Sequence, residues 1–158
     1  RGRALQATRT PLRARGTLAV LVGAPGALRT IATSLWRMGP GIRLMGSVPI
    51  AGLGELRLPE TQPGSSIMRG KVNPVIIESV TMVVARVFGN DVTVALCGQS
   101  GSLFELNVMM PVAGVTALES ITLLAASSRN LTARCIEGLQ ATDRGPVLDG
   151  SATMRATA

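Results

Sequence analysis

The sequence predicts an all-α protein that forms part of a bundle of long helices. Two apolar stretches, beginning near Pro74 and Val108, are much longer than ordinary strands, and the apolar side chains of residues 17–38 recur at helical spacing. Of the 158 residues, 46% are hydrophobic and only 16% are charged, which is typical of a folded chain and not of a disordered one.

Residues 17–38 predict the first helix. We expect the helix itself from Gly26 onward, with Pro25 as a kink because proline lacks a backbone N–H. The Gly-Pro-Gly segment at residues 39–41 is expected to break the helix. Residues 46–64 are rich in glycine and proline, so we expect an ordered loop there.

The second helix is expected to start at Pro74, directly after Asn73, because proline is favoured at the first helical position. Many of the residues that follow are β-branched, which locally favours a strand. The run is nevertheless too long for a strand. Glu78, Arg86 and Asp91 are also spaced so that a helix can turn them away from its core, so we predict a helix.

A turn is expected at residues 98–107, followed by a third helix over residues 108–137 that Gly138 ends. Residues 108–128 are long enough to span a bilayer and carry only Glu119 as a charge. We favour a helix buried in a large bundle, because the preceding helix carries two charges in mid-run, where lipid would make both costly. A chain of this size cannot cover two helices that are apolar nearly all round, so other chains or further segments must cover them.

The net charge of +7 is concentrated at the start of the chain. Residues 1–15 contain five arginines and no acidic residue, whereas residues 16–158 carry eleven basic and nine acidic groups, a net of +2. Arginines without interleaved aromatic side chains can neutralise phosphates but offer no surface on which bases stack. We therefore interpret residues 1–15 as a flexible basic arm, with nucleic-acid binding as the less favoured alternative.

The chain has no histidine, which excludes any Ser-His-Asp, Cys-His or histidine-metal mechanism built from its own residues. Its two cysteines, Cys97 and Cys135, lie far apart and have no other metal ligands near them in the sequence. Neither a disulfide framework nor a zinc site is therefore expected. We expect no metal, no cofactor and a reducing, cytoplasmic location.

Residues 64–73, GSSIMRGKVN, form the stretch whose composition packing explains least. Lys71 supplies a positive charge, Asn73 supplies directed hydrogen bonds, and the following helix start supplies N–H groups, a combination suited to binding an anion. An ordinary Gly/Ser loop that leads into a capped helix explains the same composition equally well. A Walker loop is disfavoured, since the spacing is one residue too long and Val72 stands where a hydroxyl would hold magnesium.

The sequence GSSIMRGKVNP resembles the signature loop of the fumarase/aspartase superfamily, which reads GSSIMPGKVNP in fumarases. The upstream segments GALRTIATSL, IRLMGS and GLGELRLPETQPG, and the downstream segments GNDVTVALCGQSG and FELNVMMPV, also resemble class II fumarases. The resemblance implies that residues 16–140 are a fragment of the central helical lyase domain, in the long-helix central bundle of this fold. Residues 1–15 and 141–158 are unmatched, and Arg69 replaces the loop proline.

The resemblance implies the reversible hydration of fumarate to (S)-malate, the reaction of a carbon-oxygen lyase that needs no cofactor. Ser65 would be the catalytic base, and Glu78 would orient a catalytic histidine supplied by another subunit. Four residues would bind the substrate carboxylate: Ser66, Lys71, Val72 and Asn73. The expected partners are a small dicarboxylate and the other subunits of a homotetramer, without membrane or nucleic acid.

Alternatives to this function stay open. The absence of histidine favours a non-catalytic helical remnant that serves oligomerisation, and we expect the chain to be inactive alone. A sister lyase such as aspartase is disfavoured by Gly70 and by the Phe-Glu-Leu-Asn run at residues 104–107. A membrane or nucleic-acid binder rests only on the apolar helices and the basic arm.

Overall fold

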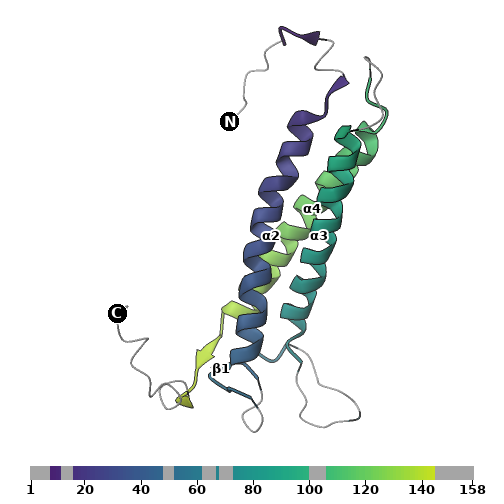
Figure 1. Ribbon diagram of the computed structural model, residues 1–158. Helices are drawn as coiled ribbons and strands as arrows, with labels where there is room; N and C mark the ends of the chain where they lie inside the picture. The colour runs from purple at the N-terminus through teal and green to yellow at the C-terminus, as the bar shows by residue number, and fades with distance from the viewer. Residues whose placement is uncertain are drawn as a thin grey trace. The chain divides into compact units, whose positions relative to one another are not determined.

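The computed structural model describes residues 8–11, 16–47, 52–61, 67, 73–99 and 106–144. These residues form long helices and two short strands (Figure 1). The helical elements are α2 (Ala19–Met45), α3 (Val75–Gln99), α4 (Met110–Leu131) and the π-helical turn η1 (Thr132–Ile136). The strands are β1 (Leu56–Arg57) and β2 (Gln140–Ala141). The all-α prediction is confirmed.

The chain divides into two compact units. Unit 1 comprises residues 1–32 and 85–124, and unit 2 comprises residues 33–84 and 125–158. Each of the three long helices contributes one segment to each unit. The start of α3, which carries the described part of the predicted site, belongs to unit 2.

The helix α2 passes through Pro25 and through the Gly-Pro-Gly segment 39–41. The predicted helix start just after Pro25 and the predicted break at 39–41 are therefore wrong. The physical reason is packing, since Pro25, Ala32 and Gly39 recur every seven residues as buried positions. A Cβ on Gly39 would lie 3.3 Å from Ile77 Cγ2, so the missing side chain permits a close approach. Packing here outweighs the cost of about 1 kcal/mol per glycine and about 3 kcal/mol per proline inside a helix.

The helices α3 and α4 each bury one stripe of side chains spaced by three or four residues. The stripe on α3 consists of Ile77, Val80, Val84, Val87, Asn90, Val94 and Cys97. The stripe on α4 consists of Ala113, Ala117, Ser120, Leu124, Ser127 and Leu131. Such spacing is that of helices packed side by side, and it confirms that the β-branched run after Pro74 is a helix.

The core of unit 1 is a cluster of small apolar side chains: Leu18, Val94, Cys97, Ala113 and Ala117. Asn107 is buried beside them and connects the end of α3 to the start of α4. Its Nδ2 donates to the carbonyl oxygen of Cys97 (3.1 Å), and its Oδ1 accepts from the N–H of Met109 (2.8 Å). The side chain of Asn107 thus caps the next helix. The helix α3 ends at Gln99 and so includes the start of the turn predicted at residues 98–107, of which residues 100–105 lie outside the described residues.

In unit 2, β1 and β2 form an antiparallel pair. The pairing is extended on one side by Thr142, whose N–H donates to the carbonyl oxygen of Glu55 (2.8 Å) and whose Oγ1 donates to that of Gly54 (2.6 Å). The expected loop at residues 46–64 thus contains a strand, which the sequence did not predict. Strands of two residues are too short to show an alternating pattern.

The π-helical turn η1 continues α4 with one wider turn. The N–H of Glu137 donates to the carbonyl oxygen of Thr132, five residues earlier (2.8 Å). Within η1 the buried residue is Cys135, four positions after Leu131. Gly138 follows in the left-handed region at φ +93°, which confirms its predicted place just past the helix end.

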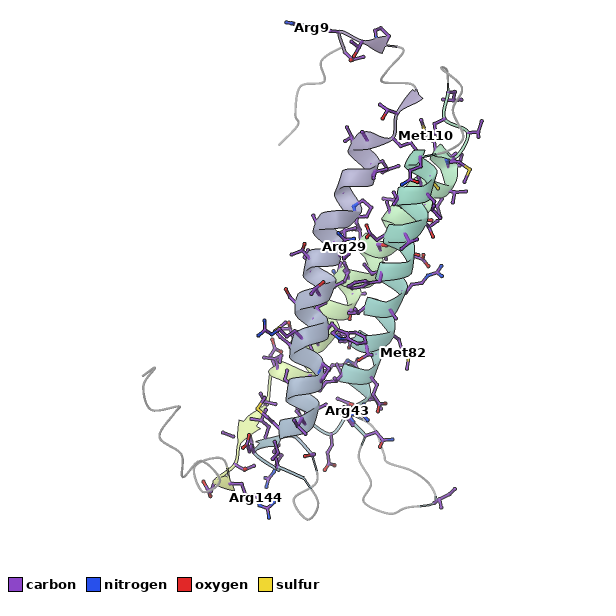
Figure 2. All side chains as sticks on the ribbon, viewed as in Figure 1. Arg9, Arg29, Arg43, Met82, Met110 and Arg144 are labelled. Carbon is purple, nitrogen blue, oxygen red and sulfur yellow. The ribbon has the colours of Figure 1, made fainter. Side chains whose placement is uncertain are left out.

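Large apolar side chains remain exposed on all three helices. Met82 is 70% exposed, Val115 70% and Leu118 65%, and Figure 2 labels Met82 on α3. By length and composition alone, α3 and the segment Met110–Ile136 could each cross a membrane, but core helices of other proteins pass the same test. The exposure of these apolar side chains agrees with the expectation that the chain does not cover its own helices.

Candidate functional site

The predicted site residues that the structure describes lie at the start of α3. The N–H of Val75 donates to the carbonyl oxygen of Asn73 (2.8 Å). The carbonyl oxygen of Pro74 accepts from the N–H groups of Ile77 (3.0 Å) and Glu78 (3.1 Å), the first bonds of the helix. The helix thus begins within one residue of the predicted position, and Asn73 immediately precedes it.

Two of the six predicted site residues can be placed. Asn73 is exposed, and Glu78 lies on the first turn of α3 with 35% of its side chain exposed. The other four, which lie outside the described residues, are Ser65, Ser66, Lys71 and Val72. Their roles stay predictions.

Glu78 faces a cation from α2. Its Oε1 lies 3.7 Å from Nη2 of Arg43, in the last turn of that helix, where Figure 2 labels Arg43. The helix dipole stabilises an acidic residue in the first turn of a helix and a basic residue in the last turn. Glu78 is therefore stabilised by α3, and Arg43 by α2. The pairing with Arg43 is not visible in the sequence, because the two residues lie 35 positions apart and only the packing of unit 2 brings them together.

A small, shallow hollow opens at the same helix start. Ten residues line it: Leu58, Pro59, Thr61, Asn73, Pro74, Val75, Ile76, Ile77, Arg134 and Cys135. Arg134 and Asn73 supply a guanidinium and a carboxamide, which are groups that bind carboxylates through hydrogen bonds. Burial raises the pKa of the Cys135 thiol, which keeps it protonated and a poor nucleophile.

A second polar cluster lies in unit 1, between α3 and α4. Nδ2 of Asn90 donates to Oε2 of Glu119 (2.9 Å) and to Oγ of Ser120 (3.0 Å). Arg86 donates to both oxygens of the same carboxylate through Nη2 (3.2 and 3.1 Å). The hydrogen bond from Asn90 and the guanidinium of Arg86 lower the pKa of Glu119. Because every group in this cluster is bound to another member, we interpret it as a structural contact between two helices.

The described residues contain no group of three or more cysteine, aspartate or glutamate side chains placed to hold a metal ion. The polar side chains described at the start of α3 include an amide, a carboxylate, a hydroxyl and two guanidinium groups. These groups are suited to binding an anion and orienting a neighbouring polar group.

Comparison with known proteins identifies similar chains. A family model described as lyase matches residues 4–89. The class II fumarate hydratase of Corynebacterium glutamicum is 54% identical over 120 residues, which are 76% of this chain and 25% of that protein. The class II fumarate hydratase of Mycobacterium tuberculosis is 55% identical over 121 residues, 77% of this chain and 25% of that protein. The chain therefore spans about a quarter of the length of these curated relatives.

Solved structures give the same result for the fold. The class II fumarase of Schistosoma mansoni matches with a TM-score of 0.85 and 33% identity, covering 92% of this chain and 30% of that one. A fumarate lyase:delta crystallin from Brucella melitensis matches with a TM-score of 0.82 and 44% identity, covering 87% of this chain and 32% of that one. The arrangement of helices is thus one that these lyases share.

Proposed function

Because the chain belongs to the lyase family, we propose that it supplies the signature-loop portion of a class II fumarate hydratase, which converts fumarate and water reversibly to (S)-malate. The observation that carries this proposal is the loop GSSIMRGKVN, placed directly before α3 in a chain about half identical to enzymes of that name. The same observation argues against aspartase, whose loop and following segment differ at Gly70 and Glu105.

The proposed roles follow from the charge that develops in the reaction. In the direction of fumarate formation, Ser65 removes the carbon-bound proton of malate, and the negative charge that this leaves spreads onto the adjacent carboxylate. A serine hydroxyl is a poor base unless nearby N–H donors and a cation stabilise its alkoxide. We assign this role to Lys71, one of two cations in the loop beside Arg69, and propose that it binds the substrate carboxylate together with Ser66, Val72 and Asn73.

The proposed assembly is a homotetramer in which other subunits complete each site. These 158 residues contain no histidine, so we assign the catalytic histidine that Glu78 orients to another subunit. The exposed apolar faces of α3 and α4 support an assembly, because a helix packed on one stripe only leaves the rest of its apolar surface in water. We place this assembly in the cytoplasm and expect neither membrane nor nucleic acid as a partner.

Complementation tests the proposed function. The tagged 158-residue chain is refolded together with a class II fumarate hydratase from a relative, whose serine equivalent to Ser65 is replaced by alanine. Loss of the fumarate double bond is then followed by ultraviolet absorbance. We expect no turnover by either protein alone and measurable turnover by the mixture. A matched mixture that contains Ser65→Ala in the 158-residue chain controls for residual activity of the relative.

The outcomes separate the proposals. If the tag captures the relative but the mixture stays inactive, the catalytic role is wrong and a non-catalytic oligomerisation module is favoured instead. If the tag captures nothing, the proposed assembly is wrong. Turnover by the 158-residue chain alone would contradict the need for a histidine from another polypeptide.

A further inference from the structure

The contact between the last turn of α2 and the first turn of α3 joins two charged side chains. Nη2 of Arg43 and Oε1 of Glu78 are 3.7 Å apart, within unit 2. This distance permits an ionic contact but is too long for a hydrogen bond. Arg43 therefore attracts the carboxylate without occupying its hydrogen-bonding positions.

The carboxylate of Glu78 has room for a second partner. An ionised carboxylate accepts about four hydrogen bonds, and the described residues donate none to this one from a side chain. With 35% of its side chain exposed, Glu78 can accept an N–H from a group that approaches from outside the unit. One side of the carboxylate would then face Arg43 and the other the incoming donor.

We propose that Arg43 is a positioning residue, whose guanidinium holds the Glu78 carboxylate in the direction from which it orients the catalytic histidine of another subunit. This inference rests on the proposed function. Arg43 touches neither substrate nor reacting atoms, and acts only through Glu78. A catalytic group must be held within about 0.5 Å of its working position, and a neighbouring fixed charge on a helix end can provide that restraint.

A purely structural role for the pair makes a different prediction. Exposed ion pairs contribute little to stability, and 60% of the Arg43 side chain is exposed, so neutral variants should fold as the parent does. A structural contact would leave kcat unchanged in the folded assembly. A positioning contact would lower kcat and leave KM nearly unchanged, since Arg43 does not bind substrate.

The test uses the complementing mixture described above. We expect Arg43→Met and Arg43→Gln to lower kcat about ten- to a hundredfold, because a misplacement of about 1 Å can cost about a hundredfold. Arg43→Lys, which keeps the charge, should recover most of the loss. The double variant Arg43→Met with Glu78→Gln should be no slower than Glu78→Gln alone. The matched control is Arg37→Ala on the same helix, for which the described residues supply no ion-pair partner, and it should retain the parent kcat.

Each result decides the inference. Unchanged kcat in both neutral variants, a rise in KM alone, or no recovery by Arg43→Lys would overturn the positioning role while the proposed function stands. If the unmodified chain does not complement the relative at all, the proposed function is wrong, and this inference is overturned with it. Circular dichroism at 222 nm of each variant verifies that the helices are intact.

Discussion

Replacing Asn90 by alanine tests whether the polar cluster of unit 1 stabilises the contact between α3 and α4. Asn90 is only 4% exposed, and its Nδ2 donates hydrogen bonds to Glu119 Oε2 and Ser120 Oγ. Alanine removes these bonds and a longer one from Nδ2 to the carbonyl oxygen of Thr116 (3.5 Å), and leaves a small void, while Ser120 keeps its own bond to that carbonyl oxygen (3.1 Å). We expect the free energy of unfolding to fall by about 1–3 kcal/mol.

Urea denaturation followed by circular dichroism measures this change. The control is Asn130→Ala, a half-buried asparagine on α4 for which the structure gives no hydrogen bond, and it should change stability by no more than about 0.5 kcal/mol. Asn90→Asp should destabilise more than alanine at pH 7, since it places a second carboxylate beside Glu119, and should recover partly on acidification. If Asn90→Ala costs no more than Asn130→Ala, the cluster contributes nothing and our reasoning is refuted.

Two further predictions concern the same unit. The hydrogen bond from Asn90 holds the pKa of Glu119 below its ordinary value, so the stabilisation it provides is present above about pH 4.5 and is lost as pH falls through the lowered native pKa. Glu119→Gln should therefore be less stable than the parent at pH 7, with a difference that shrinks toward pH 3 in urea titrations; a constant difference would contradict this linkage. A Cβ on Gly98 would overlap Val22 Cγ2, so Gly98→Ala should cost about 1–3 kcal/mol, whereas Gly89→Ala, where nothing lies within 4 Å, should stabilise by up to about 1 kcal/mol. Equal thermal shifts for the two glycine variants would show that the close approach to Val22 does not matter.

The buried faces of α3 and α4 were the most predictable part of the fold. Their apolar residues recur at helical spacing in the sequence, and the length of each run excluded a strand. The continuity of α2 was not predictable, because local propensity argues for a break at Gly39 and Pro40. Only the neighbour that packs on Gly39, Ile77 of α3, shows why the helix continues, and that contact is not visible in local sequence.

Of the residues at the candidate site, Asn73 and Glu78 have roles that only the family resemblance implies, but their place beside the helix start that Pro74 marks could be predicted from the sequence. Arg43 and Arg134 could not, since one comes from the preceding helix and the other from the π-helical turn. Contacts between distant segments depend on how the helices pack, and a single sequence does not display that packing.

The wider turn η1 changes which side chain continues the buried stripe of α4. The buried positions alternate at steps of four and three up to Leu131, so an uninterrupted helix would bury Arg134 next. The hydrogen bond from the N–H of Glu137 to the carbonyl oxygen of Thr132, five residues earlier, adds one residue to the turn. Cys135, and not Arg134, therefore occupies the next buried position. The extra residue thus rotates the residues that follow it around the helix axis and leaves the guanidinium of Arg134 in water. Burying that guanidinium without a partner would cost far more free energy than one irregular helical turn. Relatives that lack the extra residue would need an apolar side chain at the preceding position to keep the same phase.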